Sequence, residues 1–160
     1  MNHNLLVMTA LYLLVAFPLS LMDSRKFRIS LPFLLLGSIA FILCRFVFLN
    51  MPLIPGLKNL FFALSSTFLI YFCTRVFSGD GLGFGDIFFG MYSALYTGFY
   101  MNIVATVLAA LLGLLYYLLL AIIQRHKKKQ HIHRPVFAIP FVPFITAGSV
   151  LSMLLFYVLH

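Results

Sequence analysis

Long apolar runs separated by short polar segments divide the chain. Residues 5–22, 31–49 and 60–77 each come close to the length that a helix needs to cross a bilayer, which is about 20 residues for roughly 30 Å of hydrocarbon. A last apolar run covers residues 136–159. The pattern predicts one membrane-spanning helix for each of these runs.

A longer apolar run, Ile87–Ile123, has to fold back, because as one helix it would extend about 55 Å. The turn is expected at a group of small and polar residues, namely Thr97, Gly98 and Asn102. Two spans, 83–99 and 102–123, are therefore predicted here. The expected fold is an all-α membrane protein with six transmembrane helices, forming one integral-membrane domain over residues 1–160.

The composition excludes the main alternatives to a membrane protein. Hydrophobic residues make up 63% of the chain and charged residues only 9%. A soluble domain has about 45–50% apolar and about 25% charged residues. Disorder requires low hydrophobicity and high charge. Neither a soluble globule nor a disordered chain fits this composition.

Basic residues indicate the orientation. The chain has 11 Lys and Arg against 3 acidic residues, a formal net charge of +8. Most basic residues lie in two short loops, 25–28 and 125–134, which is typical of topology signals and of contacts with anionic lipid headgroups, not of nucleic-acid binding. The positive-inside rule then predicts that both termini lie outside and that Arg75 faces the cytoplasm. Only Lys58 is expected in an external loop, and Arg45 is expected to snorkel to the interface.

The N-terminal run is not expected to be a removed signal peptide. No Lys or Arg precedes it, and an Asp-Ser-Arg-Lys segment, not a small-residue cleavage site, follows it. The first span is therefore expected to stay in the mature protein.

The three acidic residues are the main candidates for chemistry. Asp23 ends the first predicted span and Asp86 begins the fourth, so the topology brings both to the cytoplasmic membrane edge. Ionisable groups at membrane depth are functional candidates. Two carboxylates held close in a site of low dielectric constant share a proton, so one can activate water while the other protonates a leaving amine. The alternative is a flexible loop whose acids only balance nearby basic residues.

A glycine-rich segment leads into Asp86. It carries four glycines at alternate positions, namely Gly79, Gly81, Gly83 and Gly85. Glycine disfavours a rigid helix and lets backbones approach closely. A peptide substrate needs such access, because an intact transmembrane helix hides its amides.

These residues resemble a known family. Gly83-Phe84-Gly85-Asp86 matches the GxGD motif of intramembrane aspartyl proteases, and the chain as a whole resembles a type IV prepilin peptidase. Asp23 at the end of the first span fits this family, as does the segment 139–144, which is similar to its Pro-Phe-x-Pro-Phe motif.

The resemblance implies a function and a set of site residues. Asp23 and Asp86 would be the catalytic pair, and the substrate-binding loops would include Gly83, Gly85, Asp80, Pro140 and Pro143. The substrate would be a prepilin or pseudopilin-like protein whose basic leader is removed at the cytoplasmic face of a prokaryotic inner membrane. No cofactor or metal would be needed. Asp80 would bind the leader's positive charge or, alternatively, pair with Arg75.

Some positions depart from the family pattern. Phe88 stands where family members often have Lys, and Phe33 follows Pro32 where Asn is common. The chain also lacks the CxxC pairs of the larger bifunctional members. It therefore resembles the short, peptidase-only type, and neither a zinc site nor N-methyltransferase activity is expected.

Two other functions remain open. A catalytically inactive assembly factor would bind pilin-like helices without cutting them, and the changes at Phe88 and Phe33 motivate this alternative. A small proton- or ion-coupled transporter is disfavoured, because transport predicts acids distributed across the membrane, whereas all three lie at one face.

Overall fold

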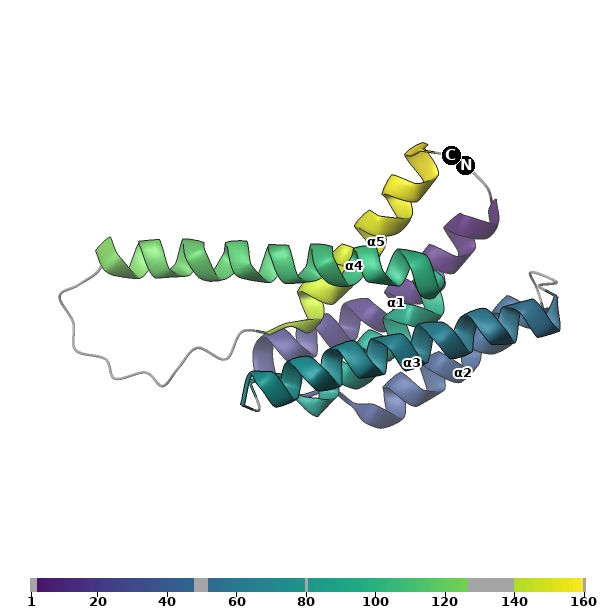
Figure 1. Cartoon of the computed structure of the whole chain (residues 1–160), viewed down its shortest axis with the longest axis horizontal. Helices are drawn as coiled ribbons and strands as arrows, with labels where there is room; N and C mark the ends of the chain where they lie inside the picture. The colour runs from purple at the N-terminus through teal and green to yellow at the C-terminus, as the bar shows by residue number, and fades with distance from the viewer. Residues whose placement is uncertain (1–2, 48–51, 80, 127–139, 160) are drawn as a thin grey trace.

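The computed structural model describes residues 3–47, 52–79, 81–126 and 140–159, and these are almost entirely helical (Figure 1). The helices are α1 (His3–Lys26), α2 (Leu31–Val47), α3 (Leu53–Phe77), α4 (Phe84–His126) and α5 (Val142–Leu159). The described residues contain no β-strand. The predicted all-α fold is confirmed.

Three of the helical segments are long and apolar enough to cross a membrane, namely Leu6–Lys26, Leu53–Phe77 and Phe84–Leu120. Two shorter apolar helices, Leu31–Val47 and Val142–Val158, accompany them. Large apolar side chains are exposed along the helices, such as Leu36 at 68% and Ile54 at 68%. A protein in water would bury such side chains, so the structure is compatible with a membrane α-protein.

The helices differ from the predicted spans in their bounds. The third begins at Leu53 and not at residue 60, so Lys58 lies within α3 and not in a loop. Pro52 precedes this helix with an extended backbone (φ −59°, ψ 127°), and the apolar residues that follow it allow the helix to start there. The predicted spans 31–49 and 136–159 both extend partly outside the described residues.

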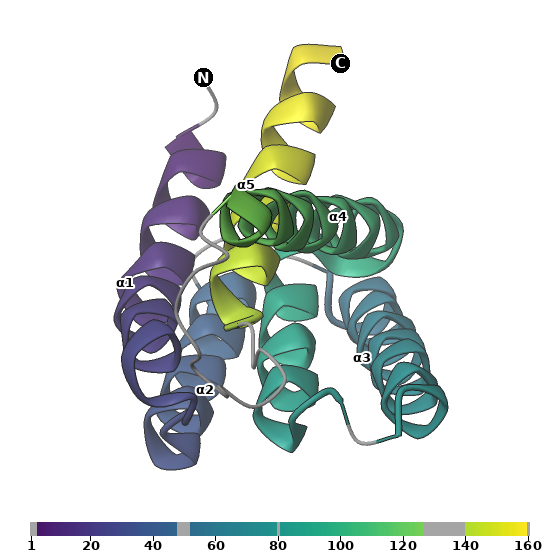
Figure 2. The ribbon, with the colours of Figure 1, turned by 90° about the vertical axis from the view of Figure 1, so that its left-hand side faces the viewer.

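The fold-back predicted between Thr97 and Asn102 is a sharp bend at one residue of α4. Gly98 has φ 72° and ψ 179°, a conformation open only to glycine, and it divides α4 into two helical parts. These parts run in different directions, and the second extends beyond the other helices at one end (Figures 1 and 2).

Neighbouring helices satisfy the backbone groups that this bend frees. In a straight helix the Phe99 N–H would bond to the Leu95 carbonyl. Instead, Phe99 N–H donates to Asn59 Oδ1 of α3 at 3.1 Å, and Arg45 Nη1 of α2 donates to the Leu95 carbonyl. Arg45 is only 7% exposed, so the prediction that it snorkels to the interface is wrong. The Leu95 carbonyl, which the bend frees, is a polar partner for the Arg45 guanidinium inside the bundle.

Hydroxyl groups and small residues hold α5 against α1 and α4. Ser20 of α1 bonds to Thr146 of α5 at 2.8 Å, and Ser149 of α5 bonds to Ser93 of α4. At Gly148 a Cβ would lie 2.5 Å from the carbonyl oxygen of Ala105, so only glycine allows this close crossing. This packing places the first turn of α5 beside the last turns of α1.

Candidate active site

Asp23 is fixed at the end of α1. Phe27, with φ 50°, ends the helix, and its N–H donates to the Asp23 carbonyl at 2.9 Å, as in a left-handed helix C-terminus. The Asp23 side chain is only 6% exposed. Its Oδ2 accepts a hydrogen bond from the N–H of Val142, the first residue of α5, at 3.1 Å. A helix start has free N–H groups and favours negative charge, which explains how a carboxylate is held here.

Asp86 is fixed at the start of α4. It is the third residue of the helix, and its Oδ2 accepts a hydrogen bond from the N–H of Gly83 at 3.1 Å. This is the part of a capping box in which the side chain in the first turn reaches back to the residue before the helix. Each carboxylate therefore has a backbone donor at a helix start, and in both cases Oδ1 has no part in that bond.

The two carboxylates line the same pocket. Its volume is about 360 Å³, and Asp23 and Asp86 are close enough for their charges to interact. The remaining lining comes from the α1–α2 connection, the first residue of α2, the residue before α4 and the start of α4: Phe27, Arg28, Ile29, Leu31, Gly83, Phe84, Gly85 and Phe88. The structure thus brings together the pair that the topology predicted to share one edge. Such a pair can hold one proton between two acids and polarise a water molecule.

The two glycines of the motif have separate steric roles. A Cβ at Gly85 would lie 2.9 Å from Cδ1 of Ile29, so α4 packs directly on this side chain from the α1–α2 connection. A Cβ at Gly83 would lie 3.2 Å from Oδ2 of Asp86. Gly85 therefore sets the distance between α4 and the α1–α2 connection, whereas Gly83 leaves room for the Asp86 carboxylate within its own segment.

Arg75 holds the glycine-rich segment in place. Its Nη1 donates to the carbonyl of Leu82, and its guanidinium lies 4.0 Å from the centre of the Phe84 ring. An arginine over an aromatic ring forms a favourable cation–π contact. The sequence suggested Arg75 only as a topology signal or a partner of Asp80, and gave Arg28 no role in the pocket. The contacts of Arg75 with Leu82 and Phe84, and the position of Arg28 in the pocket, cannot be predicted from the spacing of residues along the chain.

The prolines lie at the start of α5. Pro143 is the second residue of that helix, where its missing N–H costs nothing. Pro140 lies just before the helix. Neither lines the carboxylate pocket, but the segment that they flank includes Val142, which donates to Asp23. Asp80 lies outside the described residues.

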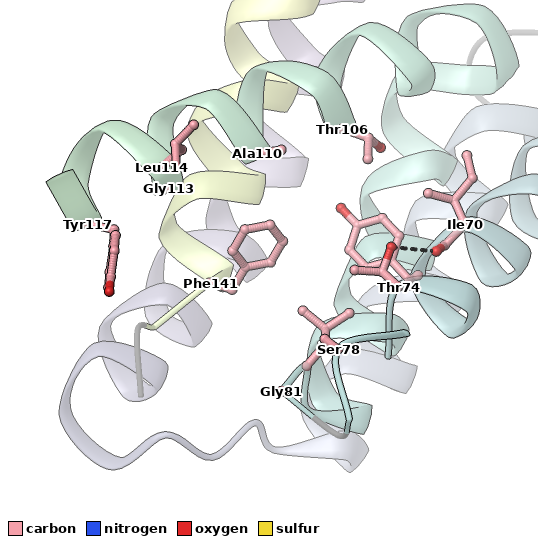
Figure 3. A pocket seen from close by; sticks show the side chains of 12 residues that line it. Ile70, Thr74, Ser78, Gly81, Thr106, Ala110, Gly113, Leu114, Tyr117 and Phe141 are labelled. Atoms are coloured by element: carbon pink, nitrogen blue, oxygen red, sulfur yellow. Dashed lines mark hydrogen bonds between the residues drawn. The ribbon is translucent and has the colours of Figure 1, made fainter. Parts of the chain in front are cut away.

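A larger pocket of about 470 Å³ lies between α3 and the second part of α4 (Figure 3). Phe141, from just before α5, faces Thr74 and Ser78 across it, and α4 lines it with Thr106 and Ala110. It shares no lining residue with the carboxylate pocket. Within the described ranges, no group of three or more His, Cys, Asp or Glu residues is placed to hold a metal ion.

Comparison with known proteins gives no match: no family model, no curated protein and no solved structure matches the chain.

Proposed function

We propose that the chain is a membrane-embedded aspartyl endopeptidase of the prepilin peptidase type. The observation that supports this most directly is the pocket lined by both Asp23 and Asp86, which come from helices far apart in sequence. The substrate would be a prepilin or pseudopilin-like protein with a basic leader followed by an apolar helix. Cleavage near their junction would remove the leader.

In this proposal the two carboxylates share one proton. The ionised carboxylate removes a proton from a water molecule as it attacks the scissile carbonyl, and the protonated one donates to the leaving amine. The two roles belong to the pair, because the titrations of two interacting acids are coupled. The backbone donors Val142 N–H and Gly83 N–H keep each side chain in place through both proton transfers.

The proposed arrangement in the membrane has six crossings. The bend at Gly98 supplies the additional crossing within α4. The first turns of α1 and the last turns of α5 lie towards the same end of the molecule (Figures 1 and 2), as expected for termini on one side. With both termini outside, the carboxylate pocket faces the cytoplasm of a prokaryotic inner membrane.

The proposal is tested by a cleavage assay. The purified protein in lipid vesicles is incubated with a model substrate whose basic leader precedes about 20 apolar residues, and the products are read by mass spectrometry. We expect one cut near the leader junction. A substrate that stays intact with several leaders, while the protein remains folded, contradicts the proposal.

A non-catalytic assembly factor is the second candidate. It is favoured by the helix contacts of both carboxylates, since a side chain that caps a helix has a structural reason to be there. Such a factor would bind a pilin-like helix and release it uncut. Substitution of Asp by Asn distinguishes the peptidase from the assembly factor. Asn keeps an acceptor oxygen for the helix contact but cannot act as acid or base, so only a peptidase would lose its activity.

A further inference from the structure

A groove of about 300 Å³ runs between α2 and α4. Its lining is almost wholly apolar: α2 contributes Leu31, Leu35 and Ser38, and α4 contributes Phe88, Met91 and Leu95. Leu95 is only 3% exposed and belongs to the floor of the groove, whereas Leu35 is 61% exposed and belongs to its rim. The groove is therefore formed by residues that the fold leaves open on one side.

The groove adjoins the carboxylate pocket. Leu31 and Phe88 line both cavities, so the two lie next to each other at these residues. The larger pocket between α3 and α4 has no residue in common with the carboxylate pocket, although its volume is greater. The shared residues therefore favour the smaller groove, and not the larger pocket, as the neighbour of the carboxylates.

The groove follows the two helices away from the carboxylates. On α4, Phe88, Met91 and Leu95 recur at the spacing that places them on one helix face. On α2, the lining runs from Leu31 to Ile42, which corresponds to about 16 Å along the helix. The pocket and the groove together thus pass from polar lining at the aspartates to apolar lining along α2 and α4.

We propose that this groove binds the apolar segment of the substrate that directly follows the scissile bond. The inference rests on the proposed peptidase function and adds where the substrate lies. One face of an apolar helix places its side chains between α2 and α4, and the first of them contacts Leu31 and Phe88. The polar residues before the junction then lie at Asp23 and Asp86, so the order of polar and apolar surface matches the order in the substrate.

Two measurements test the groove separately from catalysis. In the doubly substituted Asp23→Asn, Asp86→Asn protein, a photoreactive benzoylphenylalanine is placed at Met91 or, as the control, at Leu114 in the larger pocket. Crosslinking to the model peptide is read by mass spectrometry. In the otherwise unchanged enzyme, Ser38→Phe fills the groove and Ala110→Phe fills the larger pocket.

We expect the peptide to crosslink at position 91 and not at position 114. Ser38→Phe is expected to lower kcat/KM by about tenfold, which corresponds to the loss of one buried apolar side chain, while Ala110→Phe leaves it unchanged. If the wild type cleaves but crosslinking occurs only at position 114 or only to lipid, the proposal that the groove binds the substrate is wrong, whereas the proposed peptidase function is supported. Crosslinking at position 91 without any cleavage supports binding in the groove and overturns the proposed peptidase function. If the peptide is neither crosslinked nor cleaved, both the groove proposal and the peptidase proposal are overturned.

Discussion

The Asp23 and Asp86 carboxylates each combine two roles that are usually separate. Each accepts a backbone N–H at a helix start, which is a structural contact, and each lines the pocket in which chemistry is proposed. A loss of activity on removing either side chain would therefore not by itself identify a catalytic group. Variants that test catalysis therefore have to keep the hydrogen bond to the backbone N–H while removing the carboxyl group.

The Asp23→Asn and Asp86→Asn variants are expected to fold as the wild type does. Their amide oxygen can still accept from Val142 N–H or Gly83 N–H, whereas Asp23→Ala and Asp86→Ala leave that donor without its partner and cost about 1 kcal/mol or more. Thermal unfolding in detergent checks this. If the Asn variants unfold as readily as the Ala variants, the capping contacts do not hold the carboxylates as described.

Gly85→Ala is expected to disturb the site through Ile29. The new Cβ would lie 2.9 Å from the Ile29 side chain, and overpacking of this kind costs about 1–3 kcal/mol. The double variant, which carries both Gly85→Ala and Ile29→Ala, removes the clash. Its loss of stability should therefore be smaller than the sum of the losses in the two single variants. Unfolding temperatures of all four proteins provide the measurement, and simple additivity would show that this contact is not the cause.

The sequence predicted some of these residues better than others. Asp23 and Asp86 stood out because acids are rare in so apolar a chain. Arg45 was misjudged, because its partner is a carbonyl that becomes free only through the bend in another helix. Arg28 and Arg75 were recognised as charges but not as parts of the site, since their contacts depend on how the α1–α2 connection and the glycine-rich segment fold back.

The bend of α4 is the element that determines the arrangement of the bundle. It is held by its own glycine and by two side chains from other helices, Arg45 and Asn59. The position of the bend was predictable, because an apolar run that is too long must turn and the small and polar residues Thr97, Gly98 and Asn102 interrupt it. The donors that stabilise it were not predictable, because Asn59 was expected outside the third span.

Gly98→Ala is expected to lower stability by about 1–3 kcal/mol, because its φ of 72° with ψ of 179° strains any side chain. Gly113→Ala is the matched control on the same helix, where a Cβ would meet its nearest neighbour at an ordinary 3.4 Å. Thermal unfolding of both variants gives the comparison. Equal effects would mean that backbone conformation at the bend carries no special cost.

Asn59→Ala is expected to destabilise the same bend from the side of α3. It leaves the Phe99 N–H without the acceptor that it has at 3.1 Å, a loss of about 1 kcal/mol for a hydrogen bond in an exposed position. Ser66→Ala on the same helix is the control, since that hydroxyl bonds only within its helix turn. Amide hydrogen exchange at Phe99 should rise in Asn59→Ala alone, and unchanged exchange would show that Asn59 does not protect this N–H.

At the scale of the whole molecule, the site requires three distant segments to meet. The end of α1, the start of α4 and the start of α5 converge because α5 packs closely on α4 and α1. The sequence placed two of these segments at one membrane edge from charge and span count alone. It did not reveal that Val142 would donate to Asp23, because that contact depends on helix packing.

The proposed topology is tested by cysteine labelling in a protein with Cys44 and Cys73 replaced by alanine. Lys26→Cys lies on the side assigned to the cytoplasm, and Pro52→Cys lies at the exposed start of α3 on the other side. A membrane-impermeant maleimide should label Pro52→Cys in intact cells and Lys26→Cys only after permeabilisation. The reverse pattern would mean that the carboxylate pocket faces outward.

Catalysis by the Asp23–Asp86 pair is tested most directly by cleavage of a leader-bearing model substrate with folded wild-type, Asp23→Asn and Asp86→Asn proteins. Mass spectrometry locates the cut, and thermal unfolding of the same samples confirms that all three proteins are folded. We expect one cut near the leader junction with the wild type and a rate at least about 100-fold lower with either variant, the range for loss of a general acid or base. Full activity in a folded Asn variant would show that the two carboxylates do not act as the catalytic pair.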